Sequence, residues 1–475
     1  MSPGAVNANP VRTDPVPADL LPATPGPAVP ANVDPLNADP LNADPYVAGH
    51  GDLRYAVRHY DLQLEYKPAT NRLDGVATVE ITALVDTPEV VLDLYNLHVG
   101  KITVSGRAPK RVRHSGSRLH VVPSRPLAAG SEATVRVPYS GKPRPMPGLN
   151  GRAGWEELTD GVLVGSQPYG APSWFPCNDR SDDKATYRVT ISAPSGYHVA
   201  GNGELTHRSE RRGQTTWTFD EPDPMAPYLA CVQIGRYKVT RHTAVPSSSR
   251  PVALEIVHPH GLHAGAGTAF AEQARMIEVF SDLFGPYPFS LYRAVIADDV
   301  LEIPLEAQEL SSFGRNHVKA GWANERLVAH ELAHQWFGNS LTVARLRDMW
   351  LHEGFACYSE WLWSEFSGGR PAAAHAQQHY DQLARSPQDL LLTDPGPELM
   401  FDDRVYKRGA LALHVLRTTI GDTAFFALLR SWTAQNAYGL VDTDGFLVHV
   451  GGYASPLAEA RLTPWLFEKA LPSRP

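Results

Sequence analysis

The residues with the clearest chemistry are two histidines and a glutamate in VAHELAHQWFGNS, residues 328–340. The stretch has no proline, its apolar residues recur at helical spacing, and Gly338 supplies a stop, so it predicts a helix. On a helix, His330 and His334 project from one face one turn apart, and two imidazole nitrogens can reach one ion about 2 Å away. Glu331 lies about 100° round the helix, beside the ion, where a general base for an activated water belongs.

The pattern H-E-x-x-H is short, and it arises by chance in roughly one chain in twenty of this length and histidine content. A catalytic zinc site also needs a third protein ligand. Glu353, in DMWLHEGFACYSEWLW, is the candidate, because the 18 residues after His334 suffice to enter a second, antiparallel helix. Its apolar neighbours favour a buried ligand over a solvated carboxylate. We therefore predict that His330, His334 and Glu353 bind one zinc ion.

With these residues in place, HELAHQWFGN and WLHEGFA resemble the gluzincin aminopeptidases, the family of aminopeptidase N. WFPCNDRSDDKATYRVTI, PYPFSLYRAVIADD and VYKRGALALHVL extend the resemblance over roughly residues 50–472. The resemblance implies that Glu331 is the general base. It also implies that Tyr406, in VYKRGA, donates a hydrogen bond to the developing oxyanion, whereas a lone tyrosine is usually a core or rim aromatic.

Near the expected substrate site the chain departs from the family pattern. IPLEAQELSS, residues 303–312, stands where the family has G-A-M-E-N, with Glu306 at the glutamate position. The resemblance implies that Glu306 and Gln167, in VGSQPYGAPSWFPC, bind the free α-ammonium of a substrate. Tyr169, at a family position that is acidic, is a third candidate for binding the substrate. His352 replaces the asparagine before the third ligand.

Three further features have competing interpretations. Asp348 matches a family aspartate that could orient a ligand histidine, but a solvated carboxylate explains it nearly as well. Glu360 could also lie behind a ligand. HPHGLH, residues 258–263, looks like a metal cluster, yet its proline and glycine predict a solvated loop.

Composition is that of a large globular protein. At 475 residues, 43% hydrophobic and 20% charged, the chain can bury two or three cores. A net charge of -8 and the lack of basic clusters with interleaved aromatics exclude nucleic acid as a partner. Three cysteines without C-x-x-C spacing predict reduced thiols. Because we find no secretory signal and no run of 18 apolar residues, we expect no membrane span and a cytoplasmic location.

The fold class expected is α+β with several domains. Residues 1–45 hold 11 of the 41 prolines and the repeat PLNADPLNADPY, and predict a flexible arm or spacer. Short β-branched runs over 46–242 predict an all-β domain, which the resemblance implies is saddle-shaped. Residues 243–475 turn helical, and the resemblance implies a thermolysin-like zinc domain without the family's C-terminal helical domain.

We therefore predict a zinc-dependent aminopeptidase that acts on peptides with a free N-terminus. Two alternatives stay open at this point: a hydrolase of epoxides or other non-peptide substrates at the same zinc site, and a non-catalytic binding protein with the same fold. The sequence predicts neither the preferred first residue nor the oligomeric state.

Overall fold

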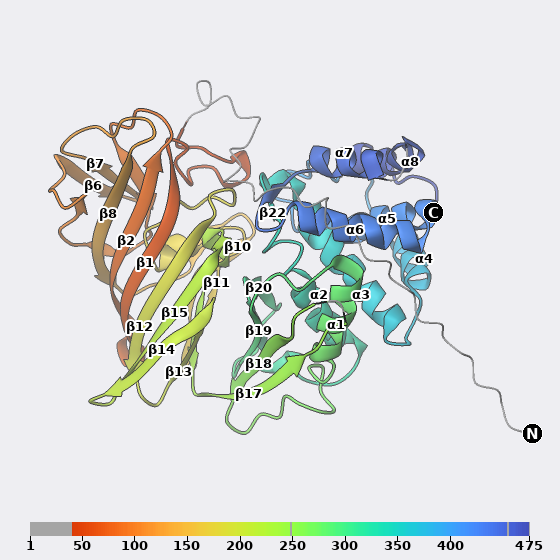
Figure 1. Ribbon diagram of the computed structural model, residues 1–475, viewed down its shortest axis with the longest axis horizontal. Coiled ribbons are helices and arrows are strands. Elements are labelled where there is room, and N and C mark those ends of the chain that lie inside the picture. Colours follow the sequence, from red (N-terminus) through yellow and green to blue (C-terminus); the bar gives the residue numbers. More distant parts are fainter. Residues whose placement is uncertain (1–39, 248, 454–455, 475) are drawn as a thin grey trace, which may run out of the picture.

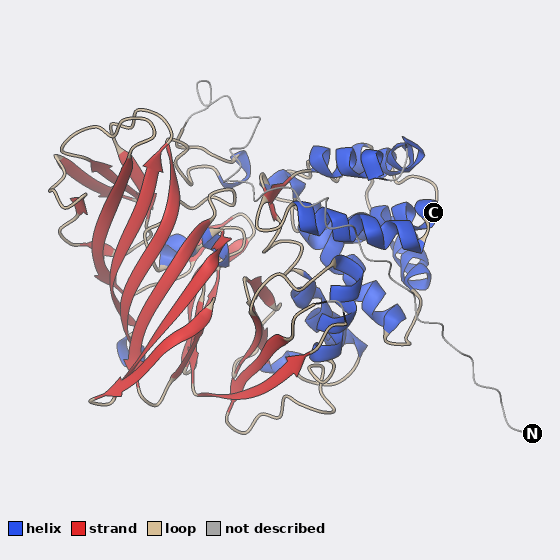
Figure 2. Cartoon of the chain, viewed as in Figure 1, coloured by secondary structure: helices blue, strands red, loops and turns tan. Residues whose placement is uncertain are grey.

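The computed structural model describes residues 40–247, 249–453 and 456–474. Strands gather in the half formed by the earlier part of the chain, and helices gather in the half formed by the later part (Figures 1 and 2). The expected α+β class, with a β domain before a mainly helical one, is confirmed. No helix in the described ranges is both long and apolar enough to cross a bilayer.

The β half is built on a large sheet with the order β14-β15-β12-β1-β2-β8-β4, and β5 pairs with β8 beside β4. Strands β1 and β12 are parallel, and the other neighbours are antiparallel. The alternating burial along β2 and β8 shows one face on the core and one facing outward, as period-two strands require. The strands are β1 (Tyr55–Lys67), β2 (Arg72–Ala83), β4 (His98–Val99), β5 (Thr103–Val104), β8 (Glu132–Gly141), β12 (Ala185–Pro194), β14 (Glu204–Arg211) and β15 (Gln214–Met225).

Two smaller sheets complete this half. One has the order β13-β16-β11-β10-β9, and the other has the order β3-β7-β6. Large aromatic side chains such as Trp155 and Trp174 fill a core that both the large sheet and the five-stranded sheet share. The strands are β3 (Val90–Asp93), β6 (Arg111–Ser115), β7 (Arg118–Val122), β9 (Met146–Gly148), β10 (Gly151–Leu158), β11 (Gly161–Gly165), β13 (His198–Gly201) and β16 (Val232–Gly235).

A third sheet, with the order β17-β18-β19-β21-β20, lies beside helices α1 and α2 (Figure 1). The predicted division at 242/243 falls inside β17 and stays a prediction. The strands are β17 (Tyr237–Ala244), β18 (Val252–Pro259), β19 (Leu291–Ala297), β20 (Leu305–Ala307) and β21 (Leu310–Gly314). A short parallel pair, β22 (Thr342–Val343) and β23 (Leu440–Val441), lies among the helices.

The helices form the second core, in which α3 and α5 pack against each other. Helix α3 is buried along nearly its whole length, including polar residues such as Glu353 and Glu360. The helices are α1 (Gln273–Phe284), α2 (Trp322–Ala333), α3 (Trp350–Phe366), α4 (Ala372–Leu383), α5 (Asp403–Ile420), α6 (Asp422–Gln435), α7 (Thr443–Tyr453) and α8 (Pro456–Phe467).

The end of the predicted arm is attached to the helical half. Most of that arm, residues 1–39, lies outside the described residues. The carboxylate of Asp44 accepts a hydrogen bond from the backbone N–H of Leu346 at 2.9 Å. Tyr46 belongs to the core of the helical half; its hydroxyl donates to Asp394 and accepts from the N–H of Gly396 at 2.8 Å. The chain therefore contacts the helical half before it enters β1.

Candidate active site

Helix α2 carries the two histidines and the glutamate, as the spacing predicts. The helix ends at Ala333, with His334 at its cap, and the chain turns at Gly338, whose φ is 134°. A Cβ at Gly338 would lie 3.2 Å from Nδ1 of His334. Glycine suits this turn for two reasons: it adopts a positive φ without strain, and it has no Cβ to crowd the imidazole.

Each imidazole ring is oriented by one hydrogen bond at its Nδ1 atom. Nδ1 of His330 lies 2.8 Å from Oε1 of Glu360, and Nδ1 of His334 lies 3.0 Å from the carbonyl oxygen of Phe337. Donation from Nδ1 leaves the lone pair of Nε2 free for a metal ion. Glu360 thus lies behind His330, as the sequence predicted.

Glu353, on the first turn of α3, lies beside both imidazoles as the predicted third ligand. Its Oε2 lies 3.2 Å from Nε2 of His330 and 3.5 Å from Nε2 of His334. All three residues are buried, and they form one of two groups in the described ranges that could hold a metal ion. Bonds of about 2.0–2.1 Å place tetrahedral ligand atoms about 3.3–3.5 Å apart, so these three atoms fit one zinc ion.

A pair of glycines brings the helix of the third ligand against the helix of the predicted tyrosine. A Cβ on Gly354 of α3 would lie only 2.8 Å from Cα of Gly409 on α5, and the reverse also holds. The two backbones therefore meet without side chains between them. This close approach places Tyr406, one turn before Gly409, beside the metal ligands.

The ring of Tyr406 stacks on the ring of His330, with centroids 6.0 Å apart and planes 18° from parallel. Burial, followed by the charges of Glu353, Glu306 and Glu331, raises the pKa of Tyr406 well above its usual value. The phenol consequently keeps its proton near neutral pH and can only donate that proton as a hydrogen bond to an oxyanion.

Glu331 has the surroundings of a general base. It is 4% exposed, and its Oε2 has no hydrogen-bond partner within the described ranges. Burial raises the pKa of Glu331, while the two neighbouring histidines oppose the rise. A buried carboxylate oxygen that lacks a partner costs free energy unless a ligand or water uses it.

The carboxylates around the site favour a cation. Burial alone would lower the pKa of His330, but hydrogen bonds to Glu353 and Glu360 raise it to about 9. Burial also tends to lower the pKa of His334, but the charges of Glu306 and Glu353 raise that pKa to about 10. An excess of buried carboxylates that attracts protons to imidazoles will also attract a divalent cation.

The second possible ligand group, Glu306, Glu331 and His334, overlaps the first. Glu306 lies on β20, directly opposite Ser311 of β21. The tight turn between these strands places Glu309 at φ 61°, a strained conformation for a residue with a side chain. Burial first, and then Glu353, raises the pKa of Glu306 to about 8.

Gln167 reaches this carboxylate from the β half. Its Nε2 donates to Oε1 of Glu306 at 2.5 Å and to Oε1 of Glu353 at 3.2 Å. The structure thus brings together two residues separated by 139 positions, beside the carboxylate of Glu353. Their role in binding an ammonium stays a prediction.

Tyr169 points elsewhere. Its hydroxyl occupies the space that a Cβ on Gly148 would take, and its ring lies 5.3 Å from the ring of His50. Both contacts are with the β half, so the predicted contact of Tyr169 with substrate has no direct support from its hydrogen bonds.

His352 and Asp348 support the backbone around the site. Nε2 of His352 accepts from the N–H of Val343 at 2.9 Å, and burial lowers the pKa of His352 to about 3, which keeps it a neutral acceptor. Asp348 accepts a hydrogen bond from Thr443, which in turn accepts from the indole of Trp350. The hypothesis that Asp348 orients a ligand histidine is wrong, because the Phe337 carbonyl takes that place.

Sequence reasoning missed Arg326. Its guanidinium lies 3.2 Å from Oε2 of Glu360, whose other oxygen contacts His330. Burial opposes ionisation, but His330 and nearby cations lower the pKa of Glu360 to about 2. The sequence could have predicted this contact, because Arg326 lies four residues before His330 and therefore on the same helix face.

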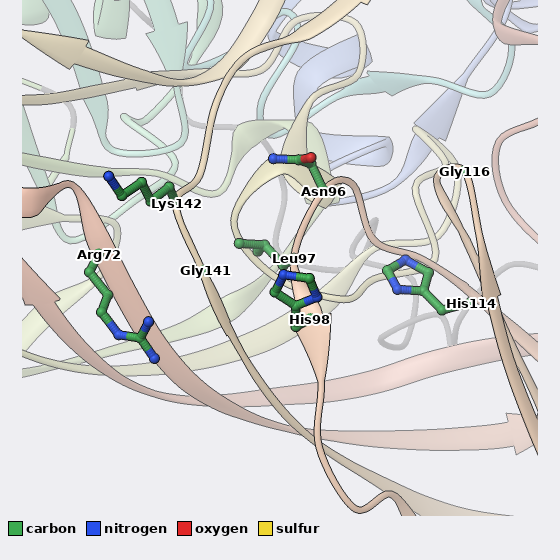
Figure 3. Close-up of a pocket in the computed structure, with 8 residues that line it drawn as sticks. All are labelled: Arg72, Asn96, Leu97, His98, His114, Gly116, Gly141 and Lys142. Carbon is green, nitrogen blue, oxygen red and sulfur yellow. The ribbon is translucent and has the colours of Figure 1, made fainter.

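Two other features lie outside this site. In HPHGLH, His258 is buried on β18 and contacts Thr240, so the expected solvated loop is wrong for His258 and Pro259, which belong to the strand. The three imidazoles form no ligand group within the described ranges. A cavity of about 480 Å³ in the β half is lined by none of the predicted site residues (Figure 3). Its cations include Lys142 and Arg72, and Arg72 is paired with Asp74 at 2.7 Å.

Comparisons with known proteins agree with this geometry. The Peptidase M1 N-terminal domain model matches residues 56–229, and the Peptidase family M1 domain model matches residues 268–459. A solved M1 zinc metallopeptidase from Deinococcus radiodurans is 33% identical with a TM-score of 0.83, and the match covers 91% of this chain and 99% of that one.

The chain belongs to the M1 family of zinc metallopeptidases. A variant of the same Deinococcus protein, with equal identity, TM-score and coverage, was solved with the substrate Tyr-Ser-Ala. Among curated M1 relatives, leucyl aminopeptidase of Saccharolobus solfataricus is 25% identical over 81% of this chain and 50% of its own length. Endoplasmic reticulum aminopeptidase 1 of Homo sapiens is 25% identical over 80% of this chain and 44% of its own. The chain therefore spans about half the length of the curated M1 relatives it matches.

Proposed function

We propose that this protein is a zinc-dependent aminopeptidase that removes N-terminal residues from peptides. The observation that carries the proposal is the position of Glu306 and Gln167 directly beside Glu353. A carboxylate that attracts an ammonium next to the metal ligands holds the first peptide bond, and not a later one, at the reacting centre. The names of the M1 relatives and the peptide bound in the Deinococcus neighbour support the same activity.

His330, His334 and Glu353 would hold the zinc ion, which supplies a Lewis acid that acidifies a water molecule and polarises the scissile carbonyl. Glu331 takes the proton of the attacking water on its unpartnered oxygen and passes it to the leaving amine. Tyr406 donates its hydroxyl proton in a hydrogen bond to the oxyanion. Glu306 accepts the α-ammonium, and the Gln167 amide fixes the direction of that carboxylate.

The test compares a free and a blocked amine. We expect the zinc-loaded protein to hydrolyse leucine 4-nitroanilide, and a chelator to stop the reaction until zinc is restored. Acetylation of the amine removes the charge that pairs with Glu306 and leaves the buried carboxylate with only the neutral Gln167 amide as its side-chain donor, at a cost of about 2–5 kcal/mol. The kcat/KM of the acetylated anilide should consequently fall by about 30- to 4,000-fold.

Each alternative gives a different result in this assay. Efficient cleavage of acetylated peptides at internal bonds would indicate an endopeptidase. Zinc-dependent hydrolysis of an epoxide without anilide hydrolysis would indicate the non-peptide alternative. Zinc binding without any hydrolysis would indicate a binding protein.

We expect Tyr406→Phe to lower kcat on the same anilide by roughly 10²- to 10³-fold, because it removes one oxyanion donor without changing the ring. The ring contact with His330 remains available to phenylalanine, so zinc content should stay at one per chain. Steady-state kinetics with metal analysis measures both quantities. A kcat within twofold of wild type would show that Tyr406 only packs against His330 and does not act as an oxyanion donor.

The proposal names peptides with a free N-terminus as partners and includes a cytoplasmic location. The location is supported by the three cysteines, which are all buried and free. Fractionation of cells that express the protein with its natural termini tests this point.

A further inference from the structure

The hairpin of β20 and β21, which carries Glu306, has a strained turn. Ala307 lies directly opposite Leu310, so the chain reverses through Gln308 and Glu309. Glu309 has a φ of 61°, a conformation that costs free energy in a residue with a side chain. Such a conformation persists only where the surrounding contacts hold it, so the partners of this turn determine where the hairpin lies.

Gln335 holds the turn from the segment that follows helix α2. Its Oε1 accepts a hydrogen bond from the N–H of Glu309 at 2.8 Å, and its Nε2 donates to the carbonyl oxygen of Ala307 at 3.1 Å. The amide thus makes the two kinds of backbone hydrogen bond that a neighbouring strand would make. Gln335 is fully buried and directly follows the predicted ligand His334, while Ala307 directly follows Glu306. This contact therefore joins the neighbour of a metal ligand to the neighbour of the proposed amine-binding carboxylate.

A second buried amide from the same segment binds the same carbonyl. Nδ2 of Asn339 donates to the carbonyl oxygen of Ala307 at 2.9 Å, so this oxygen accepts two amide donors. The carbonyl oxygens of Asn339 and Ser340 accept in turn from Nζ of Lys184, at 3.0 and 2.9 Å. Lys184 directly precedes β12, so the β half holds this segment from its other side. The backbone beside Glu306 is consequently connected to both halves of the molecule.

The distance between Glu306 and the metal site matters because the amine and the scissile carbonyl of the proposed substrate belong to the same residue. One extended residue spans about 3.3–3.6 Å, so an anchor displaced by that length would present a different bond. A misplacement of about 1 Å already costs on the order of 10²-fold in rate. Gln167 contacts the carboxylates of Glu306 and Glu353, but it does not bind the hairpin backbone. The two amides from the metal-ligand segment do.

We propose that Gln335 and Asn339 are positioning residues, which fix the distance between Glu306 and the metal site and thereby restrict the reaction to the first peptide bond. Both amides bind backbone atoms of the hairpin, so their effect on a substrate passes through Glu306. The inference rests on the proposed aminopeptidase activity and names the residues that make its amine anchor effective.

The test compares a free with a blocked amine in variants that lose these amides. Gln335→Met keeps an unbranched side chain of similar length and removes both hydrogen bonds to the hairpin. We expect its kcat/KM for leucine 4-nitroanilide to fall by at least tenfold, while kcat/KM for the acetylated anilide stays within threefold of its wild-type value. Asn339→Ala should lower the first value by at least threefold, because the Ala307 carbonyl keeps its bond to Gln335.

This selective loss separates positioning from a structural role. A variant that folds poorly or loses zinc loses both activities in proportion, because both substrates need the same metal site. Asn178→Leu is the matched control, since the buried Asn178 amide also binds the N–H and the carbonyl of one residue, Asp52, at 2.7 and 3.2 Å, but in the β half. The control should keep the free-to-acetylated ratio within twofold of wild type, even where it lowers the melting temperature.

Two results for Gln335→Met would overturn the proposal. One is a free-to-acetylated ratio within twofold of wild type at one zinc per chain. The other is loss of zinc, because Gln335 would then support His334 and not the hairpin. Should Gln335→Met fail to fold, an unchanged ratio in Asn339→Ala decides against the proposal.

Binding of free leucine gives a measurement that does not depend on turnover. In calorimetry on the zinc-loaded proteins, L-leucine should bind Gln335→Met at least tenfold more weakly than wild type, and N-acetylleucine should bind both equally. If wild type binds leucine with this pattern but hydrolyses no anilide, the proposed function fails and the positioning role survives. If wild type hydrolyses the free anilide selectively and Gln335→Met binds leucine as tightly as wild type, the function stands and the positioning role fails.

Discussion

Glu331→Gln should retain its zinc and lose nearly all turnover. Glutamine has almost the same shape as glutamate, but its amide cannot take a proton from water. Loss of a positioned general base typically costs about 10²- to 10⁴-fold in rate. Since Glu331 contributes no atom to the His330, His334 and Glu353 ligand set, metal analysis should still find one zinc per chain.

The measurement is kcat on leucine anilide with zinc content determined on the same sample. KM should change little, because the amine contact with Glu306 and Gln167 is untouched. Activity within fivefold of wild type in a fully zinc-loaded sample would remove Glu331 from the mechanism. Loss of zinc would instead place Glu331 in the ligand set.

Glu353→Ala should abolish activity by a different route, through loss of the metal. The substitution removes one of three ligands and leaves His330 and His334 without the carboxylate 3.2 and 3.5 Å from their Nε2 atoms. We expect zinc affinity to fall by more than 10³-fold, so that the purified protein is metal-free and inactive. Competition with a zinc chelator of known affinity measures the change.

Glu360→Gln is the matched control for Glu353→Ala. Glu360 also contacts His330, but through Nδ1 and not through the metal-facing nitrogen. Loss of such an outer contact costs about 10- to 100-fold in metal affinity or activity. An equal or larger loss of zinc in Glu360→Gln than in Glu353→Ala would contradict the ligand assignment.

Local spacing was sufficient to predict that His330, His334 and Glu353 lie together as candidate metal ligands. Four residues on a helix place His330 and His334 on one face whatever the rest of the chain does, and the apolar run around Glu353 predicts burial. The same argument would have placed Arg326. These are properties of single helices, so they can be read without knowing how the helices pack.

Packing between distant segments could not be predicted in this way. Asp348 looked equivalent to Glu360 in the sequence, but Asp348, just before α3, contacts Thr443, whereas Glu360, on α3, contacts His330. The contact of Gly354 with Gly409 depends on how two helices cross. The neighbourhood of Gln167 and Glu306 followed only from the family resemblance, because no local pattern relates residues on separate sheets.

The attachment of Tyr46 restricts how the two halves can move as rigid bodies. The chain crosses between the halves at both ends of the β domain: once after Tyr46 leaves the helical core, and again at β17. A hinge motion between the halves would have to bend the chain in the few residues between Tyr46, which bonds to Asp394 and Gly396, and His50, which bonds to Asp179. In the proposed enzyme, so short a connection would limit how far the two halves can separate when a peptide enters or a product leaves.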